Sequence, residues 1–204
     1  MIMKKISEGA EACIYETTIL KERAILKQRK PKSYRIRYLD EKIRASRTKK
    51  EARIMALASM LVKSPSLLLL GRHSIWMERI NGKAMNEVKP SSAASRRREL
   101  KSIGAYLGRL HANGITHGDY TPANFMVDNN GDIWLIDFGL ADMTVSFEER
   151  ALDLLLMKRS IPGSEYRIVE REYLSSFSSG KEVLNCLAEI ERRGRYQTRT
   201  LQTK

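Results

Sequence analysis

Two short segments place carboxylate and amide side chains at fixed spacings. Residues 117–124 read HGDYTPAN, and residues 136–139 read IDFG. Asp119 and Asn124 lie five residues apart, and Asp137 follows the asparagine by thirteen residues. Phosphoryl transfer from ATP needs a carboxylate that orients the attacking hydroxyl or water, and oxygen ligands that hold Mg²⁺ on the phosphates. We therefore predict that the chain binds ATP and Mg²⁺, with Asp119 as the catalytic residue and with Asn124 and Asp137 as metal ligands.

A β-hairpin is expected to bring the two segments together. Residues 125–127 and 133–136 are apolar and predict two strands. The sequence NNGD at residues 129–132 predicts the turn between them, because Asn and Gly tolerate the positive φ of tight turns. The returning strand would bring Asp137 beside Asn124. Mg²⁺ is usually held by few protein oxygens together with substrate phosphates, so these two ligands suffice.

The same segments are typical of the catalytic loop and the DFG motif of protein kinases, so the other parts of a kinase should precede them. Residues 24–27 (AILK) match the strand that carries the phosphate-contacting lysine. We select Lys27 over Lys30 and Lys32 because it directly follows the apolar run and keeps the alternation of a strand. In a kinase this lysine pairs with a glutamate of the next helix.

Residues 40–60 are expected to form that helix, because apolar residues recur in them at intervals of three and four. Glu51 lies in the middle of the helix, and we predict that it pairs with Lys27 and supports nucleotide binding. An alternative stays open, since an ion pair between Glu51 and Arg47 would be ordinary on a solvated helix surface.

Two further segments are expected to contact the nucleotide. Residues 6–12 (ISEGAEA) contain only Gly9 where protein kinases have three glycines. Their position between two expected strands predicts that they cover the phosphates, with two glutamates that would add negative charge there. Residues 74–80 (SIWMERI) predict a strand that runs into a linker, where backbone groups near Glu78 and Ile80 would bind the adenine edge.

The remainder of the chain is expected to be mainly helical. A helix from Ser91 or Ser92 to Asn113 has a serine cap and an Asn-Gly end, and Gly104 and Gly108 suggest close packing against a neighbour. Three more helices are predicted at residues 147–159, 164–177 and 181–193.

These elements predict an α+β fold, namely a compact two-lobe protein-kinase-like fold. Residues 1–80 would form a β-rich N-lobe with one long helix, and residues 81–204 a mainly helical C-lobe that ends in a basic tail. His111 is expected to be a packed or surface residue rather than a ligand. Asp153 looks like the helix aspartate that accepts backbone N–H groups of the catalytic loop, and the alternative is a plain helix-surface aspartate.

Two features of regulated kinases are missing. Gly118 stands where H-R-D would have arginine, and only seven residues separate Gly139 from the helix expected at Phe147. Activation loops switch by ordering a segment through new contacts between arginine and phosphate. We therefore expect neither regulation by a phosphorylated loop nor a broad platform for peptide substrates.

Together these residues resemble one family, the small atypical serine/threonine kinases of archaeal type that also act as ATPases. They belong to the KEOPS (EKC) complex, which modifies tRNA to threonylcarbamoyladenosine. The resemblance covers nearly the whole chain in order, with departures at Tyr120, at Pro122 and in the tail after Tyr196. It is carried by Lys27 and Asn124 and by residues 47–53 (RTKKEAR), 77–80 (MERI), 117–119 (HGD), 136–140 (IDFGL) and 148–154 (EERALDL).

The resemblance implies a role for the chain inside a larger assembly. The threonylcarbamoyl-transferring subunit would bind the C-lobe, and a small regulatory subunit would bind the N-lobe. ATP hydrolysis would support modification of the adenosine beside the anticodon. The family also phosphorylates itself on Ser or Thr.

The charge of the chain favours a nucleic-acid partner. The 204 residues carry a formal net charge of +13, an excess that suits phosphate backbones. We expect tRNA to be bound through basic patches, and no membrane to be bound, because no basic amphipathic stretch has a clean apolar face. The basic residues gather in three clusters: Arg44, Arg47, Lys49 and Lys50; Arg96, Arg97 and Arg98; and Arg192, Arg193, Arg195 and Arg199.

Cysteine usage and the first residues favour a cytoplasmic location. Cys13 and Cys186 are far apart in the chain, which is typical of reduced thiols. The N-terminus has no apolar signal segment.

Two other function classes stay open. One is another kinase-like phosphotransferase, of the RIO type or of the small-molecule type. Small-molecule kinases usually carry another residue after the second aspartate and a large substrate-binding insertion, which this length cannot hold. The other class is a structural subunit that only binds nucleotide. Retention of the whole set Lys27, Asp119, Asn124 and Asp137 argues against it.

Overall fold

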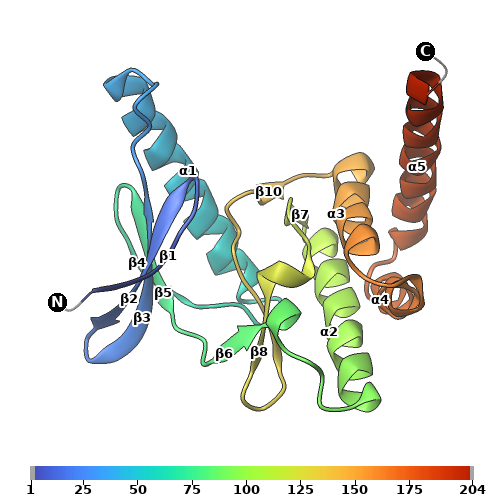
Figure 1. Cartoon of the computed structure of the whole chain (residues 1–204), viewed down its shortest axis with the longest axis horizontal. Coiled ribbons are helices and arrows are strands. Elements are labelled where there is room, and N and C mark those ends of the chain that lie inside the picture. Colours follow the sequence, from blue (N-terminus) through green and yellow to red (C-terminus); the bar gives the residue numbers. More distant parts are fainter. Residues whose placement is uncertain (1–2, 203–204) are drawn as a thin grey trace.

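A five-stranded antiparallel sheet forms the first part of the molecule (Figure 1). The computed structural model describes residues 3–202, and side chains only as far as residue 193. The strand order is β1-β2-β3-β5-β4. In this sheet Lys27 lies in register with Ile14 on one neighbouring strand and Ile75 on the other. The strands are β1 (Lys4–Glu8), β2 (Ala12–Ile19), β3 (Glu22–Arg29), β4 (Leu67–Leu70) and β5 (Ser74–Glu78).

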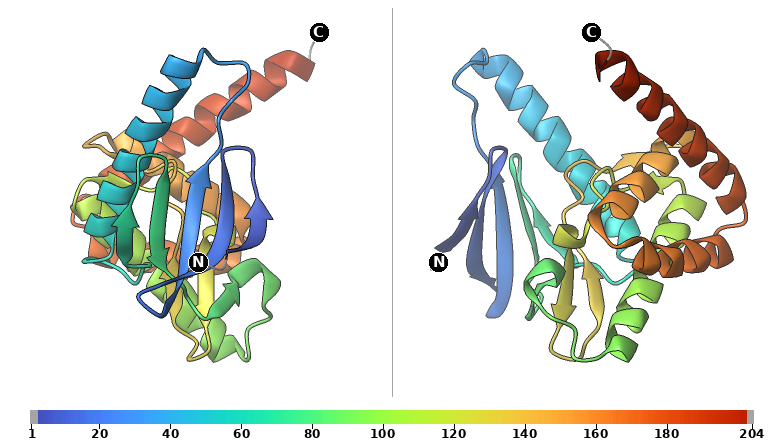
Figure 2. Two further views of the ribbon diagram at one scale, coloured as in Figure 1. Left: turned by 90° about the vertical axis from the view of Figure 1, so that its left-hand side faces the viewer. Right: turned by 45° about the vertical axis from the view of Figure 1, so that its right-hand side comes forward.

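Helix α1 (Arg37–Ala58) runs from beyond the sheet toward the second part of the molecule (Figures 1 and 2). It begins three residues before the expected start at residue 40. Asp40 lies in its first turn, where a carboxylate stabilises the helix by its attraction to the positive end of the helix dipole. This buried carboxylate also accepts the N–H of Lys32 at 3.2 Å and pairs with Arg44 at 2.6 Å. Asp40 thus ties the preceding loop to the helix.

Four helices make up most of the second part. Helix α2 packs closely on α4: a Cβ added at Gly104 would lie 2.3 Å from the carbonyl oxygen of Val169, and one at Gly108 would lie 2.6 Å from Cβ of Ser176. The expected close packing of these two glycines is therefore confirmed. The Ser92 hydroxyl accepts the N–H of Ser95 and caps α2. The helices are α2 (Ala93–Ala112), α3 (Phe147–Ser160), α4 (Gly163–Ser176) and α5 (Gly180–Gln202).

Short strands lie between the large sheet and these helices and position the two motif segments. The predicted hairpin is formed by β8 (Phe125–Asp128) and β9 (Ile133–Leu135), with β6 (Gly82–Ala84) paired on the outer side of β8. Gly131 in the turn has φ +83°, as the sequence suggested. The remaining elements are β7 (Ile115–Thr116), which pairs with β10 (Asp142–Met143), and the 3-10 turns η1 (Met85–Glu87) and η2 (Pro122–Asn124).

The predicted α+β arrangement of a β-rich first part and a mainly helical second part is confirmed. Placement of the lobe boundary at residue 80 stays a prediction. Of the third basic cluster, Arg195 and Arg199 lie outside the residues whose side chains the structure describes. Among residues 3–202, no helix has both the length and the apolar character that crossing a membrane requires.

Candidate active site

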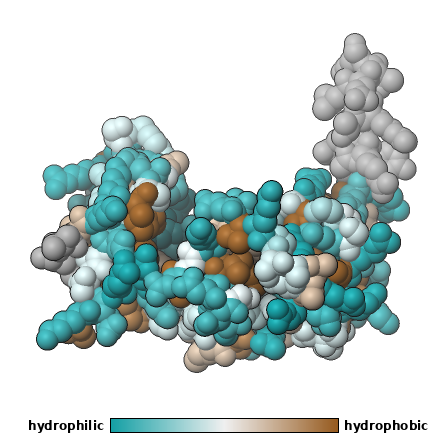
Figure 3. Space-filling model, turned by 60° about the horizontal axis from the view of Figure 1, so that its bottom comes forward, coloured by the Kyte–Doolittle hydropathy of each residue, from teal (hydrophilic) through white to brown (hydrophobic). Residues whose placement is uncertain are grey.

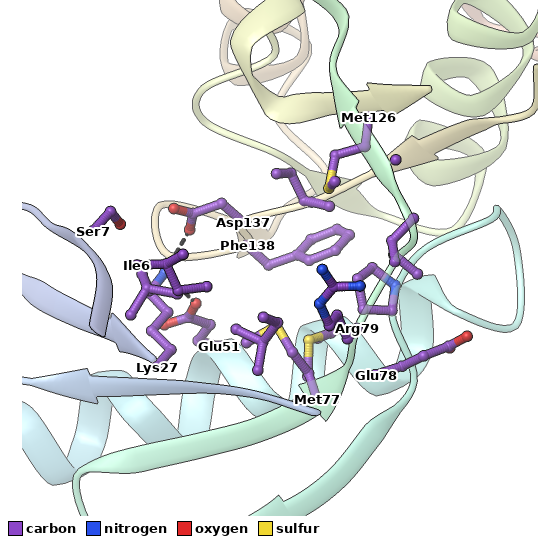
Figure 4. A pocket seen from close by; sticks show the side chains of 17 residues that line it. Ile6, Ser7, Lys27, Glu51, Met77, Glu78, Arg79, Met126, Asp137 and Phe138 are labelled. Carbon is purple, nitrogen blue, oxygen red and sulfur yellow. Dashed lines mark hydrogen bonds and ion pairs between the residues drawn. The ribbon is translucent and has the colours of Figure 1, made fainter. Parts of the chain in front are cut away.

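A cavity of about 430 Å³ lies between the large sheet and the hairpin β8–β9 (Figure 4). Apolar side chains from both sides line most of it, and Lys27, Glu51 and Asp137 lie together at one end. Glu78 lies toward the opposite end. Such a mostly apolar cavity with a few convergent charges suits a planar base with a charged tail. The apolar lining includes Ile6, Ile14, Ile25, Met77, Met126 and Ile136.

Lys27 joins the two parts of the molecule. Its Nζ lies 2.7 Å from Oε1 of Glu51 on α1 and 2.7 Å from Oδ1 of Asp137, which follows β9. Burial disfavours the charged form of Lys27, but the two carboxylates outweigh this effect and raise the pKa of its ammonium group. The lysine is therefore a fixed positive charge inside the cavity.

Glu51 binds a second cation that the sequence analysis missed. Its Oε2 lies 2.5 Å from a guanidinium nitrogen of Arg29, and both side chains are buried. The alternative of a solvated partner for Arg47 is wrong, because Arg47 pairs with Glu11 at 3.1 Å. The signal for Arg29 was present: it follows Lys27 by two residues, so both side chains lie on the same face of β3.

Asp137 has an unusual backbone conformation. Its φ is +61°, in the left-handed region that costs a non-glycine residue roughly 1–2 kcal/mol. Its Oδ1 accepts the N–H of Gly139 at 2.9 Å as well as the Lys27 ammonium. Burial would raise the pKa of this carboxyl, but Lys27 outweighs that effect and the pKa is lowered. The carboxylate therefore stays ionised.

Asn124 connects the two motif segments. Its Nδ2 donates to the carbonyl oxygen of Asp119 at 2.7 Å and to Oδ2 of Asp119 at 2.8 Å. The main-chain carbonyl oxygen of Asn124 accepts the N–H of Ile136, the residue before Asp137, at 2.9 Å. Because the amide nitrogen faces Asp119, the amide oxygen is left for another partner. Oxygens of Asn124 and Asp137 fit the hard oxygen donors that Mg²⁺ requires.

Asp153 on α3 anchors the backbone of the predicted catalytic loop. Asp153 is fully buried, and its two oxygens accept the N–H groups of His117 at 2.7 Å and Gly118 at 2.8 Å. The prediction for Asp153 is confirmed, and the surface alternative is wrong. His111 is fully buried, as expected for a packed residue. Tyr120, a departure from the family pattern, is also buried, and its hydroxyl donates to the carbonyl oxygen of Ile103 at 2.6 Å.

The backbone conformation and close packing at Gly118 explain why no arginine stands at this position of the predicted catalytic loop. Its φ is +76°, and an added Cβ would lie 2.4 Å from the carbonyl oxygen of Leu140. A side chain at this position would need both a strained backbone and a displaced neighbour. The glycine is thus required by the close approach of residue 140, which lies just after the DFG motif.

The segment around Gly9 forms the turn between β1 and β2, and its contact with phosphate stays a prediction. Ile6 and Ser7 line the cavity, whereas Gly9 forms the turn through its N–H bond to the carbonyl oxygen of Ala12 at 2.9 Å. The negative charge of the two glutamates in this segment is balanced by nearby lysine and arginine side chains. Lys30, at 2.7 Å, and Lys5 lower the pKa of the Glu8 carboxyl to about 2. The other glutamate, Glu11, contacts Arg47 at 3.1 Å and Lys32 at 3.5 Å.

Glu78 and Ile80 both line the cavity. The N–H of Glu78 donates to the carbonyl oxygen of Ser66 at 2.9 Å, so this donor is already occupied. Contact of this linker with adenine stays a prediction.

Comparison with protein families places most of the chain in one group. The family model described as RIO1, RIO domain, matches residues 9–158. The KEOPS complex subunit Bud32 of Pyrococcus abyssi is 35% identical to this chain over an alignment 217 positions long, which covers 97% of this chain and 98% of that protein. These matches confirm the family resemblance seen in the sequence.

Longer relatives contain a similar region. The probable bifunctional tRNA threonylcarbamoyladenosine biosynthesis protein of Methanobrevibacter smithii is 36% identical over 202 residues. The match covers 94% of this chain but 36% of that protein, so the chain spans about a third of the length of the bifunctional relatives that it matches.

Solved structures share the fold. The Rio2 kinase of Chaetomium thermophilum, in its complex with ADP, Mg²⁺ and phosphoaspartate, has a TM-score of 0.59 and 20% sequence identity. The likeness covers 95% of this chain and 70% of that one. At this identity it shows that the fold is shared.

Proposed function

The chain belongs to the RIO domain family, and from that premise we propose that it transfers or hydrolyses the terminal phosphoryl group of ATP in support of tRNA threonylcarbamoyladenosine modification. The observation that carries this proposal is Lys27, which contacts Glu51 and Asp137 at 2.7 Å each at the charged end of the cavity. The names of the relatives supply the tRNA context.

The polar residues of the two motif segments, together with Lys27 and Glu51, have separate roles in this proposal. Lys27 contacts the phosphates, and Glu51 keeps it in place. Asp119 orients the attacking hydroxyl or water, and the Asn124 amide holds the carboxylate of Asp119 for this task. Oxygens of Asn124 and Asp137 would hold Mg²⁺, which would supply positive charge against the phosphates. Backbone groups of the linker bind adenine.

Two exposed apolar surfaces suit the two protein partners. Surface A comprises Leu140, Met143, Val145 and Leu152, whose exposed fractions lie between 45% and 86%. Surface B is the edge strand β4, where Leu68, Leu69 and Leu70 are exposed. Hydrophilic residues cover most of the face drawn in Figure 3. On such a surface, large exposed apolar side chains favour partner contacts where they form a patch. We assign surface A to the threonylcarbamoyl-transferring subunit and surface B to the small regulatory subunit.

Reconstitution with both partner proteins, tRNA and Mg²⁺-ATP tests this function. The chain should hydrolyse ATP, and its addition should raise the amount of threonylcarbamoyladenosine measured by mass spectrometry. Val145→Glu should prevent binding of the transferring subunit alone, and Leu69→Glu should prevent binding of the small subunit alone, because each buries a charge in one interface. Equal modification with and without the chain would refute the proposal.

A stripe of cations on α1 suits the tRNA. Three of the four residues in the first basic cluster are engaged in ion pairs: Arg44 with Asp40, Arg47 with Glu11 and Lys50 with Asp142. Lys42, Lys49 and Arg53 are exposed, and none forms an ion pair within the described part of the chain. Their spacing of seven and four residues places them on one face of the helix. Lys42 also lies 4.5 Å above the exposed ring of Tyr38, at the same face.

Removal of this stripe should weaken tRNA binding. The triple variant Lys42→Ala, Lys49→Ala, Arg53→Ala should reduce the log–log salt slope of tRNA affinity by about 0.7–0.9 for each lost phosphate contact. Its affinity for Mg²⁺-ATP should not change. Fluorescence titrations at several salt concentrations measure both. A control with the same net charge replaces three scattered exposed lysines with alanine: Lys21, Lys89 and Lys181. An equal loss in the two variants would mean that only net charge matters.

A further inference from the structure

Two exposed tyrosine rings lie at the α1 tip, which comprises residues 32–42. Tyr34 occupies the turn in which the N–H of Arg35 donates to the carbonyl oxygen of Lys32 at 3.1 Å, and Tyr38 lies in the first turn of α1. Their exposed fractions are 75% and 68%. This end of α1 projects beyond the sheet in Figures 1 and 2, so both rings are open to a large partner.

The α1 tip is held in one conformation from below. Buried Asp40 accepts the N–H of Lys32 at 3.2 Å and pairs with Arg44 at 2.6 Å and with Arg35 at 3.8 Å. The guanidinium of Arg35 also lies 5.2 Å from the centroid of the Tyr34 ring. Because the tip is already ordered, a partner that binds there removes little conformational freedom from it.

The charge around the two rings is positive. Residues 30–53 contain ten lysines and arginines against three acidic residues. Glu41, the partly exposed acid of the tip, lies 3.8 Å from Arg37 and 3.7 Å from Arg72. Lys42 lies 4.5 Å above the ring of Tyr38. Such a surface suits a polyanion better than an apolar protein surface.

Tyr38 continues the cation stripe of α1. Lys42, Lys49 and Arg53 follow it by four, eleven and fifteen residues, and each of these steps returns to nearly the same face of an α-helix. Cations alone would hold a duplex and a single strand alike, since both carry phosphates. Exposed aromatic rings beside a row of cations are the pattern that binds single strands, because the cations follow the backbone while the bases stack on the rings.

We propose that Tyr34 and Tyr38 form a stacking platform for unpaired RNA bases at the end of the cation stripe. Bases in a duplex are covered by their neighbours, so only an unpaired base has a free face for a ring. A tRNA has unpaired bases in its loops and at its 3′ end. The inference rests on the proposed function only in that tRNA is the natural RNA. Binding of a single strand requires neither ATP nor a partner protein.

Fluorescence titrations of the full chain test the platform with two probes, an unstructured single-stranded RNA and the same strand annealed to its complement. Tyr34→Ala and Tyr38→Ala should each weaken single-strand binding by about 5- to 100-fold, the usual loss when a base loses its stacking ring. Duplex binding should stay unchanged. The log–log salt slope should also stay the same, because no phosphate contact is lost.

Three further variants separate stacking from other contacts. Tyr38→Phe keeps the ring and should bind the single strand as the original chain does. Ile36→Ala shortens an aliphatic side chain that is 78% exposed at the same tip, and it should leave the affinity unchanged. Tyr38→Trp places a fluorophore at the platform, and its emission should be quenched by the single strand and not by the duplex.

Three results would overturn the proposal. Equal losses of single-strand and duplex binding in the alanine variants would mean that the rings do not read unpaired bases. Equal losses in Ile36→Ala and Tyr38→Ala would mean an apolar contact without stacking. Binding to vesicles of phosphatidylcholine and phosphatidylserine in equal parts that depends on Tyr38, with no effect of either tyrosine on RNA, would assign the tip to a membrane surface.

Failure of the proposed function would be distinguishable from failure of the platform. If the chain does not raise threonylcarbamoyladenosine formation but its two alanine variants lose single-strand binding, the proposed function fails and the platform stands. If the chain supports modification but both alanine variants bind the single strand as tightly as the original chain, the platform fails and the proposed function stands.

Discussion

Replacement of Asp119 by alanine should lower ATP hydrolysis and autophosphorylation by about 10²- to 10⁴-fold, the usual range for a positioned general base. Binding of Mg²⁺-ATP should persist, because Lys27 and Asp137 form their own pair away from Asp119. Asp137→Ala should lose activity and also Mg²⁺-dependent binding, since it removes the carboxylate of the metal site and a partner of Lys27. The two variants therefore separate catalysis from binding.

Hydrolysis rates at saturating ATP, and ATP titrations with Mg²⁺ or EDTA, measure these effects. Asp132→Ala is a suitable control, because Asp132 is an exposed aspartate in the turn of the nearby hairpin and pairs only with the exposed Lys63 among the described residues. It should leave both measurements unchanged. Wild-type hydrolysis by both Asp119→Ala and Asp137→Ala would show that the site is assigned wrongly.

The parts of the site that local chemistry dictates could be predicted from the sequence. The hairpin followed from apolar strands around an Asn-Gly turn, and it brings Asn124 next to the segment that carries Asp137. The serine caps and paired glycines of α2 also followed from local patterns. In these cases the signal lies within a few residues of the feature, so no knowledge of tertiary contacts was needed.

Features that depend on contacts between distant residues could not be predicted in the same way. The sequence predicts only that His111 is a packed or surface residue rather than a ligand, and its two partners lie 42 and 62 residues further along the chain. The basic cluster of α1 was similarly ambiguous. Its cations differ only in whether a carboxylate from another element reaches them, as Glu11 reaches Arg47 and Asp142 reaches Lys50. Sequence composition gives the charge, and the fold decides which charges remain free.

Glu51→Gln should destabilise the protein strongly. It leaves Arg29 buried without its ion-pair partner, and removal of one member of a buried ion pair costs about 3–5 kcal/mol. Lys27 keeps Asp137 as a partner, so part of the charge balance survives near the cavity. Nucleotide affinity should also fall, because Lys27 is then held from one side only. Chemical denaturation gives the free energy of unfolding, and calorimetric titration gives the affinity for Mg²⁺-ATP.

Arg47→Ala is the matched control on the same helix, one turn before Glu51. Its ion pair with Glu11 is half exposed on both sides, and such pairs contribute about 0–1 kcal/mol. Arg29→Met in the Glu51→Gln background should restore part of the lost stability, because it removes the unpaired buried cation. A single Arg29→Met variant completes the double-mutant cycle and gives the interaction energy of the pair. If Glu51→Gln and Arg47→Ala reduce the free energy of unfolding equally, Glu51 does not act as the buried anion that holds Lys27 and Arg29 together.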